Sequence, residues 1–123
     1  MEQQVTVSFR QKELTEQYLQ ILDQHILDLK KGKSERTMEI RDFAAALHVH
    51  PVHLSNTIKE VTGQSTCDLY EERLLKAAKE LLADRSLSIA QVAAQLTYDP
   101  SNFTKFFKHF SGLTPKQYRA TLA

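Results

Sequence analysis

Small polar and basic side chains cluster after two prolines, Pro51 and Pro100. An amide such as Asn56 can pair with adenine through two hydrogen bonds, and an apolar side chain such as Val52 can contact a thymine methyl group. A lysine such as Lys105 can bind guanine or a phosphate. Side chains of these types are candidate contacts to base edges and to the phosphate backbone of DNA.

The candidate contacts form two sets, at outward positions of two predicted helices. The N-terminal set is His50, Val52, His53, Ser55, Asn56 and Lys59. The C-terminal set is Ser101, Asn102, Thr104, Lys105 and Lys108. For any single residue, an ordinary solvated helix face is an equally good interpretation, whereas two sets in matching positions favour a binding role.

Other chemistry is weakly indicated. His48, His50 and His53 form an H-x-H-x-x-H pattern, but the proline break gives them different local geometries and no fourth Cys or His lies close in sequence. The sequence has no Gly-rich phosphate loop and no nucleophile elbow. We therefore expect no catalytic residue, no metal, no cofactor and no enzymatic activity. The single cysteine, Cys67, is expected to be a small packing residue.

Composition and charge restrict the class of protein. The chain has 123 residues, 41% of them hydrophobic, with three Gly and three Pro, which favours one compact helical domain or two small subdomains that share a core. A net charge of +1 argues against strong, indiscriminate binding of nucleic acid. The positive charge is concentrated at the C-terminus, where residues 99–123 hold four Lys or Arg and one acidic residue.

The sequence contains neither a membrane-spanning segment nor a secretion signal. No run of eighteen apolar residues is present, and the start MEQQVTVSFRQKE lacks a basic region followed by an apolar block. A lone cysteine fits a reducing compartment. We expect a cytoplasmic protein without membrane contact.

An internal repeat positions the two sets of candidate contacts. A shift of 49 residues aligns two segments, each predicted to form a short helix, a tight break forced by proline and a second helix. This arrangement is a helix-turn-helix. The second helices are expected over 51–62 and 100–111, burying Val61 and Phe110 among other apolar residues. The identical pairs are Ile40 and Ile89, Ala44 and Ala93, Ala45 and Ala94, Leu47 and Leu96, Pro51 and Pro100, Lys59 and Lys108, and Gly63 and Gly112.

A long helix, predicted from Ser65 to Asp84, separates the two copies. Its apolar residues recur every three or four positions, and Ser65 or Thr66 can cap its first turn. About nineteen helical residues give a rod of roughly 28 Å. This length is close to one turn of duplex DNA, about 34 Å.

The N-terminal region is expected to contain one further helix, from Glu13 to Lys31, with His25 as a partly buried core residue. Alternating Val5, Val7 and Phe9 weakly indicate a short strand before it. The predicted organisation is a tail or the remnant of an upstream domain over 1–12, a helix with the first helix-turn-helix over 13–64, the linker helix over 65–84, and the second helix-turn-helix with a C-terminal helix over 85–123.

The segment IAQVAAQLTYDPSNFTKFFKHFSGLTPKQYR, residues 89–119, resembles the signature of the AraC/XylS transcription regulators. RLLKAAKELL, residues 73–82, is similar to the linker helix of that family, and the resemblance covers about residues 41–119. It implies an all-α fold of about seven helices, with two helix-turn-helix subdomains joined by a long central linker helix. In that family the second helices occupy successive major-groove segments on one face of DNA.

Two positions depart from the family pattern. Thr97 stands where the family usually has glycine, so that turn should be shaped differently or cost free energy. Asn56 stands where the first reader helix often has arginine. Near Tyr118, which is expected to pack, Arg119 could hold its own helix or a phosphate.

The expected function is sequence-specific binding of double-stranded DNA by a transcription regulator, with RNA polymerase as a second partner. The alternative is a protein-interaction module on the same fold with weak or lost DNA binding. The chain is expected to be monomeric as a domain and could dimerise through an upstream domain. Both a free-standing small activator and the C-terminal part of a longer effector-responsive protein fit the sequence.

Overall fold

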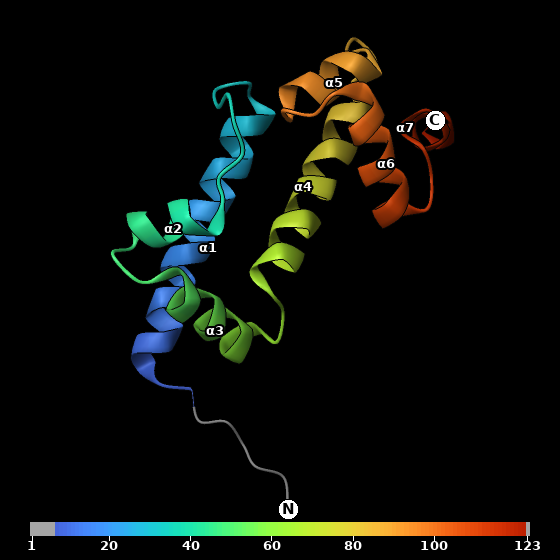
Figure 1. Cartoon of the computed structure of the whole chain (residues 1–123). Helices are drawn as coiled ribbons and strands as arrows, with labels where there is room; N and C mark the ends of the chain where they lie inside the picture. Colours follow the sequence, from blue (N-terminus) through green and yellow to red (C-terminus); the bar gives the residue numbers. More distant parts are fainter. Residues whose placement is uncertain (1–6, 123) are drawn as a thin grey trace, which may run out of the picture. The chain divides into compact units, whose positions relative to one another are not determined.

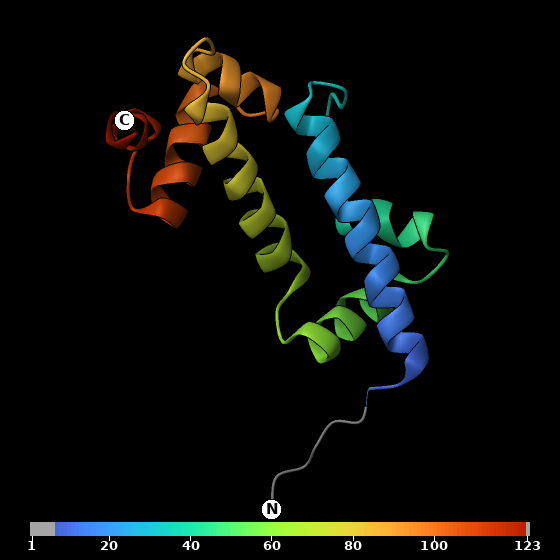
Figure 2. The same cartoon turned by 180° about the vertical axis from the view of Figure 1, so that it is seen from behind.

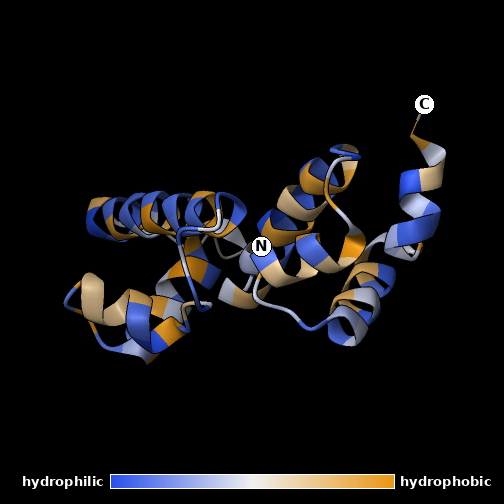
Figure 3. Cartoon of the chain, turned by 90° about the horizontal axis from the view of Figure 1, so that it is seen from above, coloured by the Kyte–Doolittle hydropathy of each residue, from blue (hydrophilic) through white to orange (hydrophobic). Residues whose placement is uncertain are grey.

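The computed structural model describes residues 7–122, which contain seven α-helices and no strand (Figure 1). This confirms the predicted all-α fold. Hydrophobic and hydrophilic residues alternate along the helices, as expected of helices that bury one face (Figure 3). Within the same residues, no helix is both long enough and apolar enough to cross a bilayer. The helices are α1 (Phe9–Lys30), α2 (Ile40–Ala46), α3 (Pro51–Thr62), α4 (Thr66–Ala83), α5 (Ile89–Gln95), α6 (Pro100–Ser111) and α7 (Pro115–Thr121).

The chain divides into two compact units. Among the described residues, the first unit comprises 7–24 and 38–71, and the second comprises 25–37 and 72–122. Each unit contains one helix-turn-helix, α2 with α3 in the first and α5 with α6 in the second.

The first unit buries an apolar cluster between the N-terminal part of α1 and the pair α2 and α3, which lie next to it in both views (Figures 1 and 2). The Tyr18 ring meets Phe43 edge to face, with centroids 5.2 Å apart. Leu54 and Ile58 on α3 are fully buried. Burial of these large side chains fixes the rotation of α3 about its axis and therefore decides which residues it exposes.

The second unit is built around α4, α5 and α6. Leu74 and Leu82 on α4, together with Phe103 and Phe107 on α6, are almost completely buried. The end of α1 belongs to this unit, where the Gln95 side-chain amide donates to the Lys30 carbonyl. His25 is buried in the same unit, as predicted.

The start of α1 differs from the prediction. The helix begins at Phe9, one turn before Glu13, so the predicted strand is wrong at Phe9. Val5 lies outside the described residues. The physical reason is a capping box, in which the Gln11 N–H donates to Ser8 Oγ at 3.1 Å and the Ser8 N–H donates to Gln11 Oε1 at 2.9 Å. These two bonds stabilise a helix start more than a five-residue alternation stabilises a lone strand.

The linker helix α4 begins at Thr66, with Ser65 as its cap. The Asp68 N–H donates to Ser65 Oγ at 3.1 Å, and the Ser65 N–H donates back to the Asp68 carboxylate at 3.3 Å. Cys67 is exposed, so the expected packing role is wrong. It lies in the first turn of α4, where it lines an open pocket with Tyr18, Phe43 and Tyr70.

Two apolar residues near the ends of the second helices are less buried than predicted. Val61 is half-buried and Phe110 is 42% exposed. Phe110 lies in the last turn of α6, where its ring contacts Phe106 and His109 at centroid distances of 5.2 and 4.7 Å. The end of α6 thus carries a small aromatic cluster at the surface.

Candidate nucleic-acid interface

The two helix-turn-helix copies keep the 49-residue register in every helix boundary. Both second helices have proline in the first turn and end at a glycine in left-handed backbone, Gly63 at φ 76° and Gly112 at φ 81°. Proline suits the first turn because it needs no backbone N–H there, and glycine adopts positive φ without a Cβ clash. The repeat read from the sequence is therefore a repeat of local structure.

The turns between the paired helices also have one shape. The residue after the C-cap has a positive φ, 57° at His48 and 66° at Thr97. The following backbone N–H donates to the carbonyl five residues earlier, at 3.0 Å in the first copy and 2.8 Å in the second. This pattern is a Schellman motif. The turn at Thr97 thus has the same shape as the turn at His48, and its left-handed backbone costs a residue with a Cβ about 1–2 kcal/mol.

The candidate contacts lie on the solvent side of α3 and α6. Val52 is 59% exposed, so its side chain can contact another molecule. Ser55 and Thr104 are half-buried, and the Thr104 hydroxyl donates to the Pro100 carbonyl at 2.9 Å. The remaining exposed residues are His50, His53, Asn56, Lys59, Ser101, Asn102, Lys105 and Lys108.

One of the candidate contacts, His50, also caps its helix, and another, Asn102, is bound to a cap. His50 is the N-cap of α3, where its Nδ1 accepts the Val52 N–H at 3.1 Å. At the equivalent position of α6, Asp99 accepts both the backbone N–H of Asn102, at 2.9 Å, and its side-chain amide, at 2.6 Å. The Asn102 amide is thus partly engaged within the chain, and Asn56 is the freer amide of the two.

The two second helices differ in charge. α3 carries Lys59 and Glu60, so it has no net charge, whereas α6 carries Lys105 and Lys108 and no acidic residue. Because phosphate neutralisation supplies much of the affinity for DNA, α6 has the stronger electrostatic attraction of the two.

The histidines of the H-x-H-x-x-H pattern have separate roles. His48 occupies the turn, His50 caps α3 and His53 lies on its first turn. No group of three or more His, Cys, Asp or Glu side chains within residues 7–122 could hold a metal ion.

Two arginines join α7 to the end of α4. Arg119 Nε donates to the Leu82 carbonyl at 2.9 Å, and Arg85 donates from α4's outgoing loop to the Leu122 carbonyl at 2.7 Å. Each guanidinium satisfies carbonyls that a helix end leaves without an intrahelical partner. Of the two roles expected for Arg119, the structure supports holding its helix. Tyr118 packs edge to face against Phe107, as predicted.

The loop after α4 contains a carboxyl group, that of Asp84, with a clearly shifted pKa. The Ser86 hydroxyl and backbone N–H donate to the Asp84 carboxylate at 2.6 and 3.0 Å, and these bonds hold the pKa of Asp84 below its usual value. The nearby Arg119 guanidinium lowers it further. The ionised carboxylate thus stabilises the turn that leads into α5.

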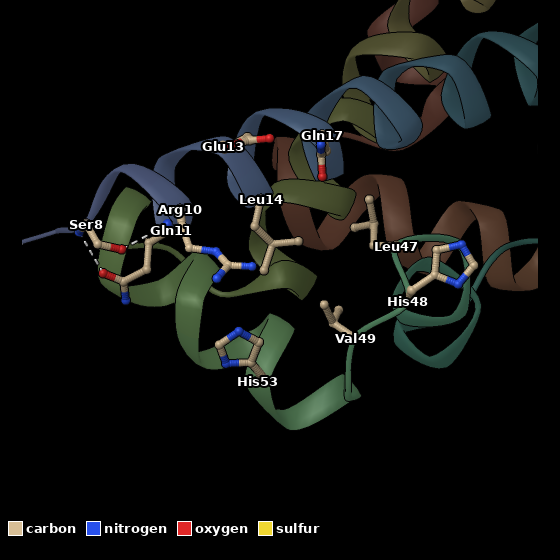
Figure 4. Close-up of a pocket in the computed structure, with 10 residues that line it drawn as sticks. All are labelled: Ser8, Arg10, Gln11, Glu13, Leu14, Gln17, Leu47, His48, Val49 and His53. Carbon is tan, nitrogen blue, oxygen red and sulfur yellow. Dashed lines mark hydrogen bonds between the residues drawn. The ribbon is translucent and has the colours of Figure 1, made fainter.

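A cavity of about 760 Å³ lies beside the first helix-turn-helix (Figure 4). It is lined by Arg10 and Leu14 from α1, by His48 and Val49 from the turn, and by His53 from α3. The sequence pattern predicts a tail or a domain remnant over residues 1–12, and Arg10 is not among the predicted contacts. The signal that could have placed it is the Ser-x-x-Gln pattern at residues 8–11, which marks a helix start.

Two helix-turn-helix units with exposed second helices define a class of DNA-binding domain, and comparison with known proteins identifies the family. A family model described as a helix-turn-helix domain matches residues 43–121. The chain belongs to this family, in its AraC-type branch of transcription regulators. The family is not an enzyme family, which agrees with the expectation from the sequence.

Several regulators are similar in sequence. The HTH-type transcriptional regulator YobQ of Bacillus subtilis, itself uncharacterized, is 31% identical over 86 residues, which cover 69% of this chain and 36% of that protein. The HTH-type transcriptional regulator GlxA of Rhizobium meliloti is 30% identical over 95 residues, which cover 76% of this chain and 29% of that protein. The chain thus spans about a third of the length of these two relatives.

Solved structures share the fold. The C-terminal domain of AraT, a response regulator from Geobacillus stearothermophilus, matches with a TM-score of 0.77 and 27% identity, covering 95% of this chain and 88% of that one. The DNA-binding domain of AdpA, a global transcriptional factor solved in complex with a target DNA, matches with a TM-score of 0.70 and 18% identity, covering 88% of this chain and 90% of that one.

Proposed function

We propose that this chain docks α3 and α6 into successive major-groove segments of promoter DNA and thereby serves as the DNA-binding part of a transcription regulator. The observation that carries the proposal is the exact 49-residue register of the two helix-turn-helix units, with matching helix faces left exposed. The fold shared with AdpA, which was solved on its target DNA, supports the same mode of binding.

The two helices contribute unequally. Asn56 reads adenine and Val52 contacts a thymine methyl group, so α3 reads bases with little electrostatic attraction. Lys105 and Lys108 on α6 bind guanine or phosphate, which gives the second unit most of the salt-dependent affinity. Ser101 holds a neighbouring phosphate.

The linker helix α4 runs from the first unit into the second. The 18 residues of α4 correspond to about 27 Å of helix. One helical turn of DNA is about 34 Å long, so α4 is slightly shorter. The protein segments at both ends of α4 can supply the remaining length. RNA polymerase is the proposed second partner. The domain binds as a monomer in the cytoplasm, and any dimerisation is assigned to an upstream domain.

Selection of binding sites from random DNA, followed by titration of the selected site at several salt concentrations, tests the proposal. The logarithm of the binding constant should fall linearly with the logarithm of salt concentration, and random DNA should bind more weakly. If the chain binds no DNA even at low salt, the proposal is wrong and the fold acts as a protein-interaction module.

A further inference from the structure

The first turn of α1 is attached to the reader helix of the first unit. The Gln11 side-chain amide donates to the Glu60 carboxylate on α3, while its amide oxygen caps the Ser8 N–H. The Thr15 hydroxyl donates to the Gln11 carbonyl at 2.8 Å, one turn further along. Gln11 thus caps the first turn of α1 and also binds that turn to α3.

This attachment places Arg10 beside the start of α3. In Figure 4, the Arg10 side chain extends from α1 into the region between Leu14 and His53, and Val49 lines the same cavity. Arg10 is exposed, and no acidic side chain within residues 7–122 forms an ion pair with it. Its guanidinium therefore has donors available for an anion from solvent.

The charge of the first unit shows what this arginine would add. The positive charge of α3 is confined to Lys59, and the adjacent Glu60 cancels it. A helix of zero net charge that enters the major groove gains little from the phosphates on either side. Arg10 lies beside His53 and next to Gln11, which contacts Glu60, at the edge of the face of α3 that also bears Asn56.

We propose that Arg10, with His53 beside it, binds a backbone phosphate that borders the groove entered by α3. The planar guanidinium matches two phosphate oxygens, and the Gln11 to Glu60 contact holds the arginine in register with the reader helix. The inference rests on the proposed function. It adds Arg10, a residue outside the helix-turn-helix, to the interface. Arg10 supplies the net positive charge that α3 lacks.

The test compares Arg10→Gln with Lys12→Gln on the selected DNA site. Both variants remove one positive charge from the same turn of α1, but Lys12 does not line the cavity. The salt dependence of Arg10→Gln should be shallower than that of the wild-type protein by about 0.9, the contribution of one phosphate to B-DNA binding. The affinity should fall by a similar factor for the selected site and for random DNA. Lys12→Gln should keep the wild-type slope.

A second arm locates the phosphate. Single neutral methylphosphonate substitutions are placed along the half of the site that α3 contacts. Substitution at one position should weaken DNA binding by the wild-type protein. The same substitution should leave the affinity of Arg10→Gln unchanged, because that variant has already lost the contact.

The outcomes separate the two proposals. Suppose that the wild-type protein binds its site. If Arg10→Gln keeps the wild-type slope, or if Lys12→Gln reduces the slope as much as Arg10→Gln does, the phosphate contact is refuted and the proposed function stands. If the wild-type protein binds no DNA at low salt, the proposed function fails, and this inference fails with it.

Discussion

Replacing Thr97 by glycine should stabilise the protein. Thr97 has a φ of 66°, and a left-handed conformation costs a residue with a Cβ about 1–2 kcal/mol. Glycine removes that cost but gives the unfolded chain about 0.5–1 kcal/mol of additional conformational entropy. The side chain is exposed, and the turn is held by backbone hydrogen bonds of 3.0 and 2.8 Å that glycine retains. The net gain in unfolding free energy should be about 0–1.5 kcal/mol, with a central value of about 0.75 kcal/mol.

Urea denaturation followed by circular dichroism measures this gain as a higher midpoint with an unchanged slope. The matched control is Lys76→Gly, an exposed position inside α4 in the same unit, which should lose about 1 kcal/mol because its backbone is helical. His48→Gly, at the equivalent turn, should gain less, since histidine tolerates positive φ better than a β-branched residue. Equal destabilisation by Thr97→Gly and Lys76→Gly would refute this reasoning.

Three further predictions address the site and the core. Lys105→Ala should weaken binding to the selected DNA by about 1–3 kcal/mol if it reads a base, and a fluorescence titration that finds wild-type affinity would exclude this role. Leu74→Ala should cost about 2–5 kcal/mol of unfolding free energy through a core cavity, because Leu74 is 1% exposed; an unchanged denaturation midpoint would contradict its packing. Since the pKa of Asp84 is lowered in the folded state, its contribution to stability is present above the unfolded value and is lost as the pH falls through the folded one. The Asp84→Asn variant, denatured at a series of pH values, should therefore lose less stability at acid pH than the wild-type protein. A pH profile of unfolding free energy parallel to that of the wild type would contradict this prediction.

The repeat made the fold predictable. Pro51 and Pro100 fix where the second helices begin, and Gly63 and Gly112 fix where they end, so both helices were predicted to the residue. Apolar periodicity then determined which faces of α3 and α6 are buried, and the exposed candidates followed from it.

Residues that depend on contacts across the fold were harder to predict. The Gln11 to Glu60 contact joins positions 49 residues apart that share no sequence pattern, so the place of Arg10 could only come from the structure. Phe110 follows the apolar period of α6, but it lies in the last turn, where few residues are available to cover it. The role of Arg119 was left open because its carbonyl acceptor on Leu82 is set by how α7 packs.

Hydroxyl-radical footprinting of the wild-type chain on its selected DNA site tests most directly whether both reader helices engage the duplex together. We predict two protected segments on one face of the DNA, with centres about one helical turn, roughly 10–10.5 base pairs, apart. A single protected segment, or two whose centres lie half a turn out of phase, would contradict simultaneous docking of α3 and α6.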